Sequence, residues 1–322
     1  MRISRGLASR AQYPHPVLTI GNFDGPHRGH LELLREVVAA AAAVEGTSIV
    51  LTFDPHPLRI LKPEIDLRFL ISVEEKLSRF REVGIQEVIF LEFNATLAAL
   101  SPEAFVFKIL RDGIGARDLF VGEAFAFGKN REGHLSDLRQ WAQAGGFRVH
   151  PVPAVRIDGE IVSSSRIRHL IQSGEVRAAA KCLGRHYALS GPVVRGEQRG
   201  RALGWPTANL VPPQDRVIPA DGVYVARARY DARQYDAVAY VGTRPTFGKG
   251  QRLLEAYLLG EGPDLYGEEL SVEFVERLRG DMTFATPEEL SARIEQDVQM
   301  AREHLRSVGQ SLMETGTGQS ER

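Results

Sequence analysis

This 322-residue sequence has little cysteine, no long apolar run and almost no excess of either charge. A single cysteine, Cys182, excludes an internal disulfide bond. No run approaches the roughly 18 apolar residues of a membrane helix, and the basic N-terminus lacks the apolar stretch of a secretion signal. The net charge of −1 lacks the surplus of lysine and arginine that nucleic-acid binding uses. These absences predict a cytoplasmic protein that binds neither membranes nor nucleic acids.

The sequence does contain enough apolar residues, 43%, for a buried core, and more length than one core usually holds. Up to about residue 150, short apolar runs alternate with helical patterns, which is typical of a parallel sheet covered by helices. Helices are expected near 29–42, after the caps Ser72 and Ser101, and over 135–144. The first of them is expected to bury Leu31, Leu34, Val38 and Ala41 or Ala42. Strands are expected at 17–20, 48–53, 87–93, 119–121 and 147–151.

After Gly184 the pattern changes to strands without intervening helices, at 187–195, 222–230, 236–241, 253–259 and 270–276. This pattern favours a small antiparallel β-barrel. One helix follows, for which Thr286 is the expected cap, Pro287 the first residue and Glu289 the partner in a capping box. The predicted fold is an α/β, Rossmann-like parallel-sheet domain (1–184), a β-barrel domain with a C-terminal helix (185–308) and a disordered tail (309–322).

The stretch GNFDGPHRGH, residues 21–30, joins the first strand to the first helix. Gly21 and Gly25 permit a tight turn and Gly29 lets a ligand approach the backbone. The helix start offers free N–H groups to an anion, and His27 and His30 add side-chain donors. This suits attack on the α-phosphate of a nucleotide. A glycine-rich surface turn is the simpler alternative, and two histidines fall short of the usual ligands of a zinc site.

A second segment, SSSRIR at residues 163–168, places hydroxyls at a helix start and two arginines, Arg166 and Arg168, in its first turn. Arginine binds phosphate through several donors. By itself the segment fits a capped helix. Together with H-x-G-H it is what a nucleotidylyl transferase needs on the other side of a triphosphate.

The second half contains no G-x-x-x-x-G-K-[ST] loop, so a phosphate site there must be built differently. Gly196, Gly200 and Gly204, beside Arg201, could close over phosphates through backbone N–H groups. Thr207 and Asn209 of the following P-T-A-N could give oxygen ligands to Mg²⁺. Glu255, in an apolar strand, could take a proton from an attacking hydroxyl. The alternatives are a hairpin loop with solvated arginines and a solvent-facing glutamate.

GNFDGPHRGH, TFDPHP, VGEAFAFG and VSSSRIR resemble the adenylyltransferase half of the prokaryotic bifunctional riboflavin kinase/FAD synthetase family. GPVV, GWPTAN, VGTRPTF and DLYG resemble its riboflavin kinase signature, and the resemblance runs from about residue 17 to about 306. It implies that the C-terminal domain phosphorylates riboflavin to FMN with Mg–ATP. The N-terminal domain would then transfer AMP from a second ATP to FMN, giving FAD and pyrophosphate.

For the transferase site, the resemblance implies three groups of residues. His27, His30 and Arg168 would be catalytic. ATP and its phosphates would contact Gly21, Asp24, Gly29, Ser164, Ser165 and Arg166. The flavin pocket would include Asp54, His56 and Phe125, although Phe125 and Phe127, two apart on a strand, are also typical of a core.

For the kinase site, the resemblance implies that Glu255 is the general base for the 5′-hydroxyl of the ribityl chain. Thr207 and Asn209 would hold Mg–ATP, and the phosphates would contact Gly196, Gly200, Arg201 and Gly204.

The sequence departs from the family at Ala124, where Asp or Asn is usual, and more mildly at Ser165 for Thr and Val162 for Ile. Alanine offers no side-chain hydrogen bond to flavin or ATP. One alternative is therefore a riboflavin kinase with weak or lost adenylyltransferase activity, and a more distant one is a non-catalytic flavin-binding or regulatory protein. The sequence leaves the oligomeric state open between a monomer and a transient homo-oligomer.

Overall fold

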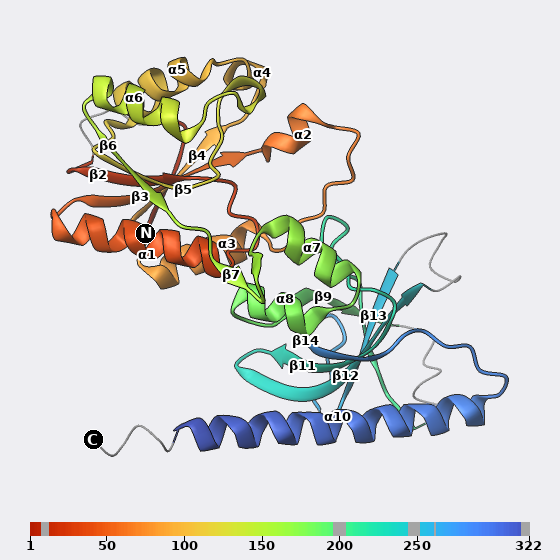
Figure 1. The fold of residues 1–322 in the computed structure, drawn as a ribbon. Helices are drawn as coiled ribbons and strands as arrows, with labels where there is room; N and C mark the ends of the chain where they lie inside the picture. Colours follow the sequence, from red (N-terminus) through yellow and green to blue (C-terminus); the bar gives the residue numbers. More distant parts are fainter. Residues whose placement is uncertain (8–12, 196–203, 244–251, 261, 317–322) are drawn as a thin grey trace. The chain divides into compact units, whose positions relative to one another are not determined.

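A computed structural model of the chain (Figure 1) describes residues 1–7, 13–195, 204–243, 252–260 and 262–316, with only the backbone for 243 and 308–316. These residues divide into two compact units, Met1–Ser164 and Ser165–Arg322. Within the described residues, no helix is long and apolar enough to cross a membrane. The predicted fold class is confirmed in both units.

The first unit is built on a six-stranded parallel sheet with the strand order β1-β4-β3-β2-β5-β6. Five strands match the predicted ones to within about two residues. The edge strand β1 was not predicted, because Arg-Ile-Ser-Arg contains a single apolar residue. The strands are β1 (Arg2–Arg5), β2 (Pro16–Ile20), β3 (Thr47–Asp54), β4 (Glu87–Glu92), β5 (Asp118–Gly122) and β6 (Arg148–Val152).

Helices cover both faces of this sheet, so the core lies in two layers (Figure 1). One layer packs under α1 (Arg28–Ala43) and α3 (Val73–Val83). The other packs under α5 (Pro102–Phe105), the π-helical η2 (Val106–Ile114) and α6 (Leu135–Gly145). The smaller elements are α2 (Pro57–Leu61), α4 (Ala95–Ala98), η3 (Lys129–Arg131), β7 (Arg156–Ile157) and β8 (Glu160–Ile161).

The predicted caps of this unit are confirmed, but the predicted buried face of α1 is partly wrong. Ser72 Oγ accepts from Glu75 N at 3.0 Å while Glu75 Oε2 accepts from Ser72 N at 2.7 Å. Ser101 Oγ accepts from Ala104 N at 3.1 Å. Helix α1 buries Leu33, Leu34, Val37 and Ala41 instead of Leu31 and Val38. Apolar residues lie on more than one side of this helix, and packing against the sheet determines which side is buried.

The second unit is a closed antiparallel barrel with the strand order β10-β13-β12-β11-β14-β9. The long helix α10 packs on β11, β12 and β14 through Val298, Ala301 and Leu305. The short strand β10, which was not predicted, completes the barrel between β9 and β13. Its elements are α7 (Ser164–Gln172), α8 (Val176–Leu183), β9 (Tyr187–Val194), β10 (Ala208–Leu210), β11 (Gly222–Tyr230), β12 (Arg233–Thr243), β13 (Arg252–Leu258), β14 (Glu269–Arg279) and α10 (Pro287–Gly316).

Two boundaries of the second unit differ from the sequence-based ranges. Helix α8 packs on β14 and β9, so the compact units separate at Ser164 and Ser165, ahead of the predicted boundary at 184. Helix α10 continues to Gly316, into the range 309–322 that was predicted as a tail, and residues 317–322 lie outside the described part.

The predicted capping box of α10 is only half present. Thr286 Oγ1 accepts from Glu289 N at 3.2 Å, as expected, but the Glu289 carboxylate accepts from Ala285 N at 3.0 Å. The helix start is therefore closed one residue earlier than the standard box would close it.

Candidate functional sites

The turn between β2 and α1 has a backbone that its sequence explains. Phe23 and Gly25 lie in the left-handed region, with φ of 49° and 59°. A side chain at Gly25 would meet Leu70 at 2.6 Å, so glycine is required there. The Phe23 ring is buried and packs edge-on against Phe80 and His30 at 5.6 and 5.0 Å. The Phe23 side chain thus anchors the turn in the core.

The two histidines of the motif lie together at the start of α1. His27 Nδ1 accepts from His30 N at 3.2 Å, and the two rings stack with centroids 3.7 Å apart. Because Nδ1 accepts this bond, a neutral His27 carries its proton on Nε2 and keeps a donor there. Any side chain at Gly29 would contact the His27 ring at 3.4 Å.

His30 is half-buried, and its buried Nδ1 has no hydrogen-bond partner within the described part of the chain. Burial, and in second place His27, lowers the pKa of His30 well below its usual range. His30 is therefore uncharged near neutral pH. An incoming phosphate would provide the negative charge that favours its protonated, donating form.

Asp24 and Ser164, both predicted to contact ATP, make bonds to the protein. The Asp24 carboxylate accepts from Leu70 N at 3.0 and 3.2 Å, and only 6% of this residue is exposed. Ser164 Oγ donates to the Asp24 carbonyl at 2.8 Å. These bonds tie the turn at Asp24 to Leu70 and Ser164. The ATP contacts of Asp24 and Ser164 stay predictions.

The remaining phosphate residues of the first site lie on helix α7 of the second unit. Ser165 is exposed, and Arg166 and Arg168 are half-buried. Ile167 and Ile171 anchor the opposite face of the helix. Their contacts with a triphosphate stay predictions.

The D-P-H-P segment closes the end of β3. Asp54 Oδ2 accepts from Arg5 Nη1 of β1 at 2.8 Å. His56 Nδ1 caps α2 by accepting from Leu58 N at 3.2 Å, and its ring lies edge-on to Phe69 at 5.6 Å. Sequence reasoning missed Arg5, because it lies on the strand that was not predicted.

The aromatic pair of VGEAFAFG belongs at least in part to the core. Phe127 is buried, and Phe125 stacks on it with ring centroids 5.3 Å apart and an interplanar angle of 13°. Trp141 packs edge-on against Phe127 at 6.4 Å. This agrees with the core interpretation of Phe127. A flavin contact of the half-buried Phe125 stays a prediction, and Ala124 is exposed.

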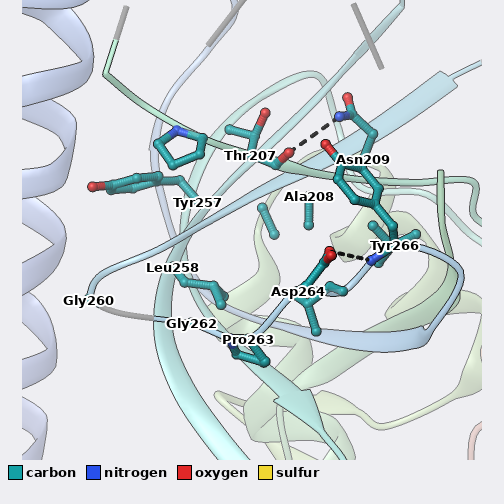
Figure 2. A pocket seen from close by; sticks show the side chains of 14 residues that line it. Thr207, Ala208, Asn209, Tyr257, Leu258, Gly260, Gly262, Pro263, Asp264 and Tyr266 are labelled. Carbon is teal, nitrogen blue, oxygen red and sulfur yellow. Dashed lines mark hydrogen bonds between the residues drawn. The ribbon is translucent and has the colours of Figure 1, made fainter. Parts of the chain in front are cut away.

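In the second unit, a pocket of about 450 Å³ opens beside β10 and β13. Figure 2 shows Thr207 and Asn209 side by side on one segment of its wall, where Asn209 Nδ2 donates to the Thr207 carbonyl at 3.4 Å. The other walls come from β13 and from residues 260 and 262–266, and include Tyr257, Asp264 and Tyr266.

The barrel register brings Glu255 to this segment. Asn209 pairs with Glu255 across β10 and β13, and Thr207 Oγ1 donates to Glu255 Oε2 at 3.3 Å. Glu255 is only 9% exposed, so the solvent-facing alternative is wrong. A buried carboxylate next to a hydroxyl and an amide is equipped to receive a proton. The structure therefore brings Glu255 to Thr207 and Asn209, which lie almost fifty residues earlier in the sequence.

The donor set here fits a hard cation. The hydroxyl of Thr207 and the amide oxygen of Asn209 are oxygen ligands of the kind that Mg²⁺ prefers, and phosphates and water would complete the set. In the residues that the structure describes, no cluster of three or more His, Cys, Asp or Glu could hold a metal ion. Of the predicted phosphate loop, Gly204 has φ of 86°, and Gly196, Gly200 and Arg201 lie outside the described residues.

Comparisons with known proteins place both halves in one family. The family model for FAD synthetase matches residues 9–166, and that for riboflavin kinase matches residues 183–305. A bifunctional riboflavin kinase/FMN adenylyltransferase of Pseudomonas fluorescens is 37% identical over 304 residues, covering 94% of this chain and 97% of the relative. The chain belongs to the bifunctional riboflavin kinase/FMN adenylyltransferase family.

Members of this family from other bacteria are similarly close. The protein of that description from Escherichia coli K12 is 34% identical over 306 residues, with 94% of this chain and 97% of the relative covered. A crystal structure of a Streptococcus pneumoniae protein described as a macrolide-efflux protein has a TM-score of 0.83 at 28% identity, covering 94% of this chain and 98% of the other. The family fold thus extends over nearly the whole chain.

Proposed function

We propose that this protein converts riboflavin to FMN with ATP in its barrel, and FMN to FAD with a second ATP in its N-terminal half. The observation that carries the proposal is the meeting of Thr207, Asn209 and Glu255 beside the pocket of the barrel. The matches to both family models support it. We also propose that it acts in the cytoplasm, as the sequence predicts.

In the barrel, Glu255 accepts the proton of the ribityl 5′-hydroxyl as that oxygen attacks the γ-phosphate of ATP. The bond from Thr207 Oγ1 orients the carboxylate before substrate arrives. A magnesium ion held by Thr207 and Asn209 would neutralise charge on the phosphates when bound. Gly196, Gly200, Arg201 and Gly204 are proposed to close over them.

In the N-terminal half, a phosphate oxygen of FMN attacks the α-phosphate of ATP, and pyrophosphate leaves. The start of α1 and the Nε2 donor of His27 stabilise the charge that develops there, with His30 beside them. Gly21, Asp24 and Gly29 shape the turn. We assign the leaving phosphates to Ser164, Ser165, Arg166 and Arg168, and the flavin to Asp54, His56 and Phe125.

We propose residues 1–184 and 185–308 as the two functional domains, followed by the tail 309–322. The ranges of the two family matches, 9–166 and 183–305, support this division. Helices α7 and α8 then belong to the transferase by function although they lie in the second compact unit.

A second candidate is a riboflavin kinase that makes FAD weakly or not at all. The exposed Ala124 favours it, because the family usually offers a polar side chain at this position.

One chromatographic experiment separates the candidates. Riboflavin, ATP and Mg²⁺ are incubated with the protein, and the flavin products are resolved over time. The proposal predicts FMN first and then FAD with pyrophosphate, and no flavin product when EDTA removes the metal. Accumulation of FMN without FAD would favour the second candidate, and unchanged riboflavin would exclude both.

A further inference from the structure

Lys76 is a half-buried lysine that lies outside every motif of the first site. It belongs to α3, and its Nζ donates to the backbone carbonyl of Asn22 at 3.3 Å. The same nitrogen lies 5.6 Å from the centre of the Phe90 ring. Burial lowers the pKa of Lys76, and the nearby carboxylates of Asp24 and Asp54 oppose this shift.

A charged lysine in such a place is unusual, because burial of an ammonium is unfavourable unless the charge is used. Its position follows from the sequence, since Lys76 is four residues before the buried Phe80 and therefore shares the inward face of α3. A leucine there would satisfy the core more simply. The single hydrogen bond that the Lys76 ammonium makes among the described residues goes to the turn between β2 and α1.

That bond fixes the peptide that joins Asn22 to Phe23. In a planar trans peptide, the carbonyl and the following N–H point in opposite directions. Since Lys76 holds the Asn22 carbonyl towards α3, the N–H of Phe23 points away from α3. This N–H has no hydrogen-bond partner in the described part of the chain.

The backbone conformation that directs the Phe23 N–H away from α3 is unfavourable and needs a stabilising contact. Phe23 has φ of 49°, a conformation that residues with a side chain rarely adopt. The side-chain oxygen of Asn22 is also buried without a hydrogen bond in the described residues. The peptide between Asn22 and Phe23 is therefore strained and has an unpaired N–H donor. Lys76 binds the carbonyl of the same peptide.

We propose that Lys76 is a positioning residue for adenylyl transfer: it holds the Asn22 carbonyl so that the Phe23 N–H faces the phosphate of the nucleotide. This rests on the proposed function of the N-terminal half. The bound group is a phosphate oxygen on which negative charge develops during transfer, so the effect of Lys76 falls mainly on kcat.

The variants Lys76→Met and Lys76→Arg test this, with Arg79→Met as the matched control. Arg79 lies on the same helix but pairs at the surface with Glu82. Lys76→Met should lower kcat for FMN adenylylation by about tenfold to a hundredfold, with the KM for ATP and the riboflavin kinase activity unchanged. Lys76→Arg should recover most of the loss, and Arg79→Met should match the wild type.

A pH profile separates positioning from simple packing. A charged donor binds the Asn22 carbonyl more strongly than a neutral amine does. Adenylylation should therefore fall as Lys76 loses its proton, and the lowered pKa of Lys76 puts this fall at a lower pH than is usual for lysine. Arginine stays protonated, so Lys76→Arg should move this alkaline limb to higher pH. Asp24 and Asp54 face Lys76, and Arg5 pairs with Asp54 and contacts the same Phe90 ring. On the helix itself, Glu75 is bound to Ser72 N.

Amide hydrogen exchange at Phe23 gives a readout that does not require turnover. ATP should protect the Phe23 amide in the wild type and in Arg79→Met, and should fail to protect it in Lys76→Met. Equal protection in all three, an unshifted alkaline limb in Lys76→Arg, or equal losses of both activities in Lys76→Met would overturn the proposal. Absence of FAD from the wild type would count against the proposed function, and the exchange result would still decide on Lys76.

Discussion

The two regions that we propose to bind phosphates differ in what they are made of. The N-terminal turn works with backbone: two left-handed residues, a helix start and a histidine cap hold N–H groups in place. The barrel works with side chains, since Thr207, Asn209 and Glu255 meet only because β10 pairs with β13. A backbone site is damaged by changes of conformation and a side-chain site by changes of functional group, so substitutions should separate them.

The largest separation is expected for Glu255→Gln. The amide keeps the shape of the side chain but cannot accept the ribityl proton, so FMN formation should fall by about a thousandfold. FAD formation from supplied FMN should match the wild type. Both rates come from one flavin chromatogram. Loss of FAD formation as well would show that the regions are not independent.

The reverse pattern is expected for His30→Asn. It removes the half-buried imidazole at the start of α1, so FAD formation should fall by about a hundredfold while riboflavin phosphorylation persists. The assay supplies FMN and measures FAD, with FMN production from riboflavin as the internal control. A variant that keeps full FAD formation would remove His30 from the proposed site.

Gly25→Ala examines how far the turn depends on its backbone. The new methyl group would meet Leu70 in a left-handed residue, so unfolding should become easier by about 1–3 kcal/mol with a loss of FAD formation. Gly146→Ala is the control, because Gly146 has φ of 74° but nothing within 4 Å of the added carbon. Urea unfolding should show the larger effect at Gly25, and equal effects would mean that Leu70 adds nothing.

The smallest effect is expected for Asp118→Asn, a change in strand β5 that lies outside both proposed phosphate sites. Burial alone would raise the pKa of Asp118, but hydrogen bonds from Arg148, His15 and His150 outweigh it and lower the pKa to about 2. The stabilisation is present above the usual pKa of 3.8 and is lost as the pH falls towards 2. Asp118→Asn should therefore cost about 2 kcal/mol at pH 7.

Unfolding curves at several pH values check this last prediction. The difference in stability between Asp118→Asn and the wild type should shrink between pH 4 and pH 2, with both activities retained at pH 7. A difference that does not depend on pH would show that the variant acts through packing and not through the charge of Asp118.

The sequence predicted what is local and left out what depends on tertiary pairing. The caps at Ser72 and Ser101, the strand before GNFDG and all barrel strands except β10 follow from periodicity and short-range chemistry. The burial of Glu255 depends on strand register, which composition does not encode. Strand β1 was missed because its residues are polar, and with it Arg5. Lys76 lies outside every motif, and its place four residues before the buried Phe80 is the only sequence feature that indicates its inward position.

The most direct test of two independent sites is complementation between Glu255→Gln and His30→Asn. Each variant alone, given riboflavin, ATP and Mg²⁺, should form no appreciable FAD. When they are mixed, FMN made by the barrel of His30→Asn should be adenylylated by the N-terminal half of Glu255→Gln, and FAD should accumulate. If each variant has lost both activities and the mixture forms no FAD even with added FMN, the account of two separate sites is wrong.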